Sequence, residues 1–229
     1  PPLAATVGDL RFFVANVSLV TSGGVEEPVS LTPDGVWQSE SLALVDLEAA
    51  CDTSGNAELH ADLPGTVLAG DYTGIAFDLG VPFADNHLDS TTAPAPLNIP
   101  AMFWSWQSGY KFVRVELKLA AEAGGSWLLH IGSVGCVSDS GVRPPDSECP
   151  HANRTRVTLT GFDPADDRIV LDLDALFAGT DLSVNAPKSP PGCMSDLAEA
   201  SDCAPPFERL GIDFATGGPG KAATAFVVR

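Results

Sequence analysis

Three side chains suited to redox or soft-metal chemistry recur at every second position of AMFWSWQSGYKF, residues 101–112. They are Met102, Trp104 and Trp106, in a chain with only two Met and four Trp. Because alternate residues of an extended strand share a face, the spacing predicts that the three line one side of a strand. A thioether beside oxidisable indole rings suits a soft-metal or redox site. The same strip also suits a β-sandwich core, which spacing alone favours.

The four histidines are the other candidate metal ligands. His87 lies in a long, proline-rich loop, residues 82–100, and long loops of this kind often carry function. His130 lies on a predicted strand, where a histidine is more often a half-buried residue with a partner than a ligand. Two neutral imidazoles and a thioether suit Cu(I), but the order of residues does not show that these groups meet. His60 and His151 are expected at the surface.

The five cysteines separate into two local pairs and one remainder. Cys136 and Cys149 bracket a polar, turn-rich interval, and Cys193 and Cys203 bracket another. This arrangement favours two local disulfides in an exported protein. Metal ligation is the alternative, although the chain has no CxxC and no Cys/His tetrad at zinc spacing. Cys51 is left over.

Composition and missing motifs exclude several classes of function. The chain of 229 residues has 12 basic and 30 acidic residues, a net charge of −18, so nucleic acids and anionic membrane surfaces would repel it. It has no GxSxG, HExxH, Walker A or GxGxxG motif, and no CxxCH for covalent haem attachment. No apolar run is long enough for a transmembrane segment, and no signal peptide is visible at the start. No catalytic residue can be selected, although a secreted enzyme without a known motif stays open.

Apolar residues alternate with period two in several stretches, and Gly, Pro, Asn and Asp separate these stretches. This pattern predicts an all-β fold, an antiparallel β-sandwich or barrel-like domain with long loops and a few short helices. In residues 57–63 it turns His60 outward. The whole chain, residues 1–229, is expected to form a single domain. The predicted strands are residues 9–20, 41–48, 57–63, 72–80, 110–120 and 126–134, followed by RVTLTGF and RIVLDLD, and the predicted helices are LDALFAG and MSDLAEASD.

Six segments in order resemble one known family. They are DLRFFVANVSLV, DGVWQSESLALVDLE, YTGIAFDLGVPFADNHLD, MFWSWQSGYKFVRVEL, HIGSVGC and GCMSDLAEASDC. The chain is similar to the MbnP-like proteins, which are found with methanobactin and copper-handling operons and beside a dihaem partner of the MauG type. The similarity runs through most of the chain.

The resemblance implies an exported, periplasmic or secreted, β-rich protein that binds copper. The family's NH motif falls on Asn86 and His87, and the histidine before its GS step is His130. On this basis we expect copper, as Cu(I), to be held by His87 and His130, with Met102 as a soft third contact. His60 and His151 match no motif of the family.

The family's WxW motif falls on Trp104 and Trp106. The resemblance implies that the dihaem partner, a MauG-type peroxidase-like protein, oxidises one of them to kynurenine. The chain would then be a binding protein and the substrate of an oxidase, with no catalytic residue of its own. The alternative is a β-sandwich module for a carbohydrate or a protein, with the two tryptophans as an exposed aromatic platform.

The chain departs from the family at its beginning. The resemblance implies a further strand with a cysteine before DLRFFV, and here only eight residues precede that segment. We therefore expect that an N-terminal segment is missing from this sequence and that its cysteine would pair with Cys51.

Overall fold

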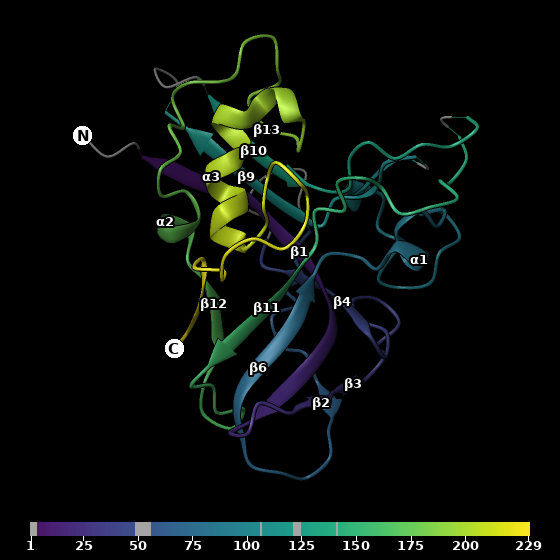
Figure 1. Ribbon diagram of the computed structural model, residues 1–229, viewed down its shortest axis with the longest axis vertical. Coiled ribbons are helices and arrows are strands. Elements are labelled where there is room, and N and C mark those ends of the chain that lie inside the picture. The colour runs from purple at the N-terminus through teal and green to yellow at the C-terminus, as the bar shows by residue number, and fades with distance from the viewer. Residues whose placement is uncertain (1–3, 49–55, 106, 121–124, 141) are drawn as a thin grey trace.

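The long strand β1 (Ala5–Thr21) organises the fold, because four other strands of the described main sheet pair directly with it. The computed structural model describes residues 4–48, 56–105, 107–120, 125–140 and 142–229 (Figure 1). The main sheet has the strand order β11-β6-β1-β9-β10-β13, and β2 and β4 also pair with β1. Its other strands are β2 (Glu26–Pro28), β4 (Leu42–Asp46), β6 (Tyr72–Leu79), β9 (Val113–Leu119), β10 (Ser126–Ile131), β11 (Thr155–Thr160) and β13 (Gly192–Cys193).

Smaller elements lie around this sheet. Three two-stranded sheets pair β3 (Ser30–Leu31) with β5 (Gly65–Thr66), β7 (Phe103–Ser105) with β8 (Gly109–Tyr110), and β12 (Ile169–Leu171) with β14 (Phe226–Val228). The helices are α1 (Phe83–Asn86), α2 (Leu173–Leu176), α3 (Ala200–Leu210) and the 3-10 turns η1 (Pro100–Met102) and η3 (Leu197–Glu199). The predicted all-β class with a few short helices is confirmed. Among the described residues, no helix is both long and apolar enough to cross a bilayer.

One edge of β1 changes its pairing partner at Phe13, a position that we call the fork. Its first half, through Phe12, pairs with β9, and its second half, from Val14, pairs with β6. Since β4 pairs with both halves across the fork, β9 and β6 must occupy the same edge of β1 in succession. At the fork the backbone N–H of Phe13 donates to Phe112 O, and the carbonyl of Phe13 accepts from Gly80 N, both at 2.9 Å. Residues 81–111 therefore leave and rejoin the sheet at one residue.

Two apolar clusters occupy opposite faces of β1. The larger one contains Phe12 and Val14, together with Trp127 of β10 and residues of α3. Helix α3 covers the upper half of the sheet (Figure 1). The smaller one takes Phe13 with residues from the 81–112 segment. The alternation read from the sequence predicted the larger cluster well, because β1, β6, β9 and β10 each place every second side chain in it.

Two predicted strands are wrong. Residues 57–63 make only an isolated bridge between His60 and Asp46, and Leu59, predicted to point inward, is 58% exposed. His60 is buried instead, stacked on Trp37 with its Nδ1 atom 2.8 Å from Leu44 O. The imidazole of His60 can donate a hydrogen bond to the buried carbonyl of Leu44, so this polar side chain can be buried. The alternation of apolar residues, on which the prediction is based, treats histidine only as a polar residue.

The strand predicted to carry Met102, Trp104 and Trp106 on one face is also interrupted. Pro100 opens the 3-10 turn η1, closed by a hydrogen bond from Met102 N to Ile99 O (3.0 Å), so that β7 begins only at Phe103. Met102 therefore precedes the strand and does not share a strand face with Trp104. Trp106 lies outside the described residues.

Candidate functional site

The fork brings together three segments that are distant in sequence: the end of α1, strand β7, and the turn after β10. Asn86 contacts Ser133, Trp104 lies on Gly132, and His87 lies against Cys149. These segments carry the NH, WxW and HIGSVGC motifs. The structure thus gathers three of the stretches that the sequence had marked as separate motifs.

Asn86 joins the segments by hydrogen bonds. Its side chain is 1% exposed, and its Oδ1 atom accepts from the backbone N–H of Tyr110 at 2.9 Å. That bond fixes the orientation of the amide, so Nδ2 is the group that donates to Ser133 Oγ at 3.4 Å and lies 3.2 Å from His87 Nε2. Gly109, at φ +76°, allows this approach, because a Cβ atom there would collide with the Asn86 side chain.

His87 is buried, with 6% of its surface exposed. Its ring makes an edge contact with Phe83, with 5.4 Å between centroids, and its Nε2 atom lies 3.7 Å from Cys149 Sγ. Since Asn86 Nδ2 can only donate, Nε2 of His87 accepts and carries a lone pair. The imidazole is therefore in the form that can bind a metal.

Both predicted disulfides are present, Cys136–Cys149 and Cys193–Cys203. The first closes the loop against which His87 packs. The second joins β13 to α3 and holds the helix on the sheet. Cys51 lies outside the described residues. Two disulfides fit an extracytoplasmic environment.

Trp104 is half-buried at the edge of a surface cavity of about 400 Å³. Its ring lies on Gly132, and the cavity is also lined by Ser133, Cys136 and Met194. Sequence reasoning missed Met194. A signal was available, since it is the only other methionine and adjoins Cys193.

Met102 is fully buried, at 0% exposure, in the smaller apolar cluster with Phe13 and Tyr110. Its backbone carbonyl accepts from Lys111 N at 2.7 Å. Its neighbours in this cluster are apolar and aromatic side chains, an ordinary core environment for a thioether.

His130 lies on the opposite face of β10 from Trp127, as predicted, and is 8% exposed. Its Nε2 atom is 2.9 Å from Glu116 Oε1 of the neighbouring strand. Because a carboxylate only accepts, Nε2 carries the proton in this contact. Burial lowers the pKa of His130 more than Glu116 raises it, so the ring is neutral at pH 7 and Nδ1 holds the lone pair.

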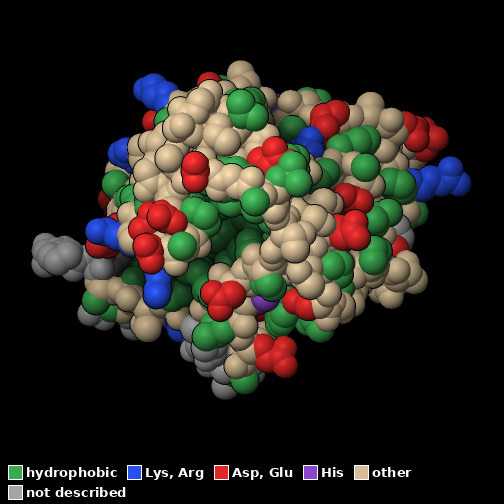
Figure 2. All heavy atoms as spheres, turned by 90° about the horizontal axis from the view of Figure 1, so that it is seen from below, with side chains coloured by type: hydrophobic (Ala, Val, Ile, Leu, Met, Phe, Trp, Pro, Cys, Tyr) green, Lys and Arg blue, Asp and Glu red, His purple; other side chains and the backbone are tan. Residues whose placement is uncertain are grey.

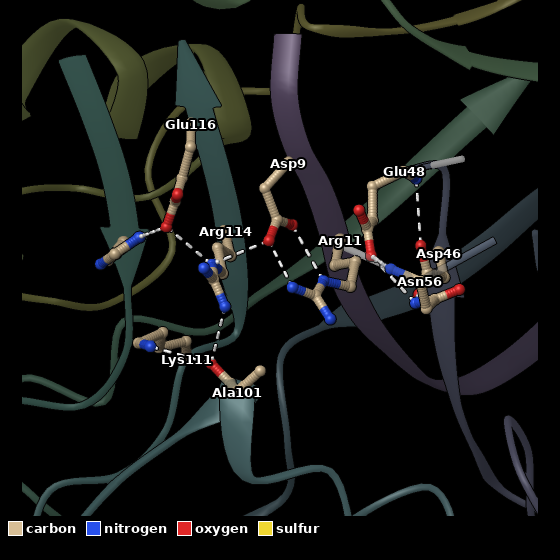
Figure 3. Close-up of polar contacts among 10 residues, drawn as sticks. Asp9, Arg11, Asp46, Glu48, Asn56, Ala101, Lys111, Arg114 and Glu116 are labelled. Carbon is tan, nitrogen blue, oxygen red and sulfur yellow. Dashed lines mark hydrogen bonds and ion pairs between the residues drawn. The ribbon is translucent and has the colours of Figure 1, made fainter. Parts of the chain in front are cut away.

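Glu116 belongs to a chain of charges that crosses three strands on this face (Figure 3). Arg114 Nε lies 2.8 Å from Glu116 Oε1 and 3.0 Å from Asp9 Oδ2, and Arg11 forms an ion pair with Asp9. Asp9 and Arg11 are buried, so each charge needs its partner. The hydrogen bond from His130, followed by that from Arg114, lowers the pKa of Glu116 to about 2.

The carbonyl of Ala101 ties this charged chain to the WxW stretch. It accepts from Arg114 Nη1 at 3.0 Å and from Lys111 Nζ at 2.9 Å (Figure 3). Burial, followed by the nearby Arg114 charge, lowers the pKa of Lys111 to about 8. Through Arg114, the residue before Met102 is thus linked to the group that orients His130.

The described contacts place His87 and His130 in different surroundings, the first beside a disulfide and the second beside a carboxylate. Within the described ranges, the two groups of three potential ligand atoms lying within 4.8 Å of one another are His87 with Cys136 and Cys149, and Glu199 with Cys193 and Cys203. Both contain a disulfide, whose sulfurs are not thiolates. His130 belongs to neither group.

His151 is half-buried, in contrast to the surface position expected for it. It bridges to Val134, with Val134 N donating to His151 O at 2.9 Å. Its Nδ1 atom is buried and has no hydrogen-bond partner in the part of the chain that the structure describes.

Comparisons with known proteins identify the family and the fold. A search of curated proteins found no match. A solved structure, MbnP from Methylosinus trichosporium, is similar over 99% of this chain and 88% of its own, with a TM-score of 0.84 and 30% sequence identity. The MbnP family model matches residues 3–195, which include all three motifs gathered at the fork. The chain belongs to the MbnP family.

Proposed function

We propose that this protein is an exported, periplasmic or secreted, copper-binding protein that has no catalytic activity of its own. The observation that carries the proposal is the state of its two candidate imidazoles. His87 presents a lone pair at Nε2 and neutral His130 presents one at Nδ1, which suits them to hold Cu(I). The copper site has a role in copper acquisition or handling.

Glu116 supports His130 as a ligand. Metal-binding histidines usually donate their second N–H to a carboxylate, which fixes the tautomer and makes the other nitrogen more basic. The Glu116–His130 contact has this form. For His87, a metal at Nε2 would replace the 3.2 Å hydrogen bond from Asn86 Nδ2.

A methionine supplies the soft third contact in this proposal. Met102 is the residue indicated by the sequence, and Met194 is the second candidate because it lines the cavity beside Trp104. Substituting leucine at each position keeps the volume of the side chain and removes the sulfur. Only the true ligand should change copper affinity when it is replaced.

We further propose that a tryptophan of the WxW motif is oxidised to kynurenine by a MauG-type dihaem partner that uses hydrogen peroxide. Two peroxides insert two oxygen atoms across the C2–C3 bond of the indole, which opens the ring and releases two waters. Water then removes the formyl group as formate. Half-buried Trp104 lies at a surface cavity, where an oxidising haem on a docked partner can withdraw electrons. The net charge of −18 favours a basic docking face on that partner.

The alternative of an exposed aromatic platform is not supported by the placement of Trp104. A platform needs the face of the ring free for a sugar or a peptide. The Trp104 ring instead lies on Gly132 and is half-buried.

The test is a Cu(I) titration in competition with a chromogenic chelator. His87→Ala and His130→Ala should each weaken binding by at least about tenfold. His60→Gln, which changes the buried histidine stacked on Trp37, is the matched control and should bind as the unmodified chain does. Unchanged affinity in His87→Ala would contradict the copper site.

The oxidation has a separate test, mass spectrometry of the peptide that covers residues 101–111. Kynurenine adds about four daltons to a tryptophan, and fragmentation assigns the change to Trp104 or Trp106. The protein should be produced together with its dihaem partner and, as control, without it. An unmodified peptide in both samples would refute the oxidation and leave the copper proposal standing.

A further inference from the structure

A second, larger cavity of about 510 Å³ opens on the lower end of the molecule (Figure 2). Figure 2 shows it as a hollow with hydrophobic walls. Its walls include Phe12 and Val14 of β1, Phe77 of β6, Leu63, and Phe226 of β14. None of its lining residues belongs to the 81–111 segment or to the turn after β10.

The size and the walls of this cavity distinguish it from a packing defect. Protein interiors are close-packed, and voids much larger than one water are few. Apolar cavities hold water poorly and take up apolar molecules instead. About 510 Å³ lies within the range of small-molecule sites, and phenylalanines and aliphatic side chains are their usual lining.

The charged residues that line the cavity are exposed or half-buried, and more of them are acidic than basic. Asp62 and Asp167 line it, with one basic residue, Arg168. Asp167 belongs to the turn DPADD, whose Asp163 and Asp166 are exposed. Figure 2 shows several carboxylates around the opening. This excess of negative charge, on a chain of net charge −18, attracts cations and repels carboxylates such as fatty acids.

We propose that this cavity binds a small, elongated molecule with an apolar body and a cationic end, such as an alkylamine or an alkyl quaternary ammonium compound. The apolar body lies between β1, β6 and the segments that carry Leu63 and Phe226. The cationic end stays at the mouth, near Asp62 and Asp167. This site is independent of copper and of the proposed oxidation.

The test is isothermal titration at low salt with three probes of equal chain length, decyltrimethylammonium, decanol and decanoate. The two ionic probes are kept below their micelle concentrations and decanol below its solubility limit. The cationic probe should bind most tightly, decanol less tightly and decanoate least, and added salt should reduce the difference between the charged probes. Failure of all three to bind, or equal binding of decanoate and the cationic probe, would overturn the proposal.

Two variants locate the site. Asp62→Lys should weaken binding of the cationic probe by about fivefold. Asp139→Lys makes the same change of charge in the loop between Cys136 and Cys149 and should leave this binding unchanged. Ala61→Trp places a large ring at the mouth, where Ala61 is exposed, and should abolish binding of all probes without disturbing the core. Circular dichroism checks that each variant is folded. Binding retained in Ala61→Trp would refute the site. A dimer in light scattering that Ala61→Trp converts to a monomer would also refute it, because the mouth would then be a dimer interface.

Discussion

The ring of Trp104 lies on Gly132 so closely that a Cβ atom at Gly132 would stand 2.6 Å from Trp104 Cζ3. The same Cβ atom would stand 2.6 Å from the carbonyl oxygen of Tyr110. Glycine at this position is therefore what allows β7 to approach the turn after β10. Trp104, one of the two candidates for the proposed oxidation, can therefore pack here only because Gly132 has no side chain.

Gly132→Ala should displace Trp104 and destabilise the protein by about 1–3 kcal/mol, because an added methyl group overpacks the contact. Tryptophan fluorescence should shift as the ring moves, and thermal unfolding measures the loss of stability. Gly23→Ala is the matched control, since the nearest atom to a Cβ there is 3.8 Å away. A Gly132→Ala variant with unchanged fluorescence and melting temperature would contradict the described contact.

Asn86→Ala should cost about 1–3 kcal/mol in the free energy of unfolding, because it leaves the buried N–H of Tyr110 without its acceptor. Chemical denaturation measures this loss. Ser133→Ala removes the 3.4 Å contact with Asn86 Nδ2 and the 3.1 Å hydrogen bond from Ser133 Oγ to Ala152 O. It leaves the N–H of Tyr110 bonded to Asn86, so it should cost less than Asn86→Ala, about 1 kcal/mol. Equal losses in the two variants would show that Asn86 does not join the segments as described.

Glu116→Gln should remove part of the acid sensitivity of the fold. The pKa of Glu116 is lowered from 4.5 to about 2, so its charged form stabilises the folded state. This contribution is complete above pH 4.5 and is lost as the pH falls towards 2. At pH 6 we expect a loss of about 2 kcal/mol in the variant, and near pH 2 a smaller difference between variant and parent.

Denaturation curves over this pH range check the prediction. Glu58→Gln, which replaces an exposed carboxylate, serves as the control and should leave the pH profile unchanged. A constant difference between Glu116→Gln and the parent at every pH would contradict the assigned charge state. If His130 binds copper, Glu116→Gln should also weaken Cu(I) binding by about tenfold, by the loss of its supporting carboxylate.

Replacing Cys136 and Cys149 together by serine should destabilise the protein by about 3 kcal/mol and should also weaken copper binding, because His87 packs against Cys149. Replacing Cys193 and Cys203 in the same way should cost a similar amount of stability. That second pair joins β13 to α3, so its loss should change the copper affinity less. Titrations of both double variants, with thermal unfolding as the stability readout, separate the two effects.

The sheet was predictable because its strands obey a simple alternation. In β6, β9 and β10, every second residue enters the larger apolar cluster, which is the pattern that period-two reading detects. The two disulfides followed from the short, polar intervals that they close. By contrast, the fork in β1 depends on a change of pairing partner, from β9 before Phe13 to β6 after it, which the alternation of apolar residues in β1 does not reveal.

The candidate site was predictable only in part. The similarity to a family singled out His87, His130 and Trp104 by their motifs, but it could not show that His130 donates to Glu116 of a neighbouring strand. Met102 was expected on the face of a strand, and Pro100 changes the backbone before that strand begins. Met194 was missed because its place beside Trp104 depends on β13 and on the folding of the turn after β10.

Because Phe13 is hydrogen-bonded to both Gly80 and Phe112, residues 81–111 form an insertion between β6 and β9. Its two ends meet at one residue, so its length and content can change in evolution while the sheet keeps its register. The same geometry suits engineering. A segment of different length, taken from a relative and joined at these two anchors, should transplant a new site onto this scaffold.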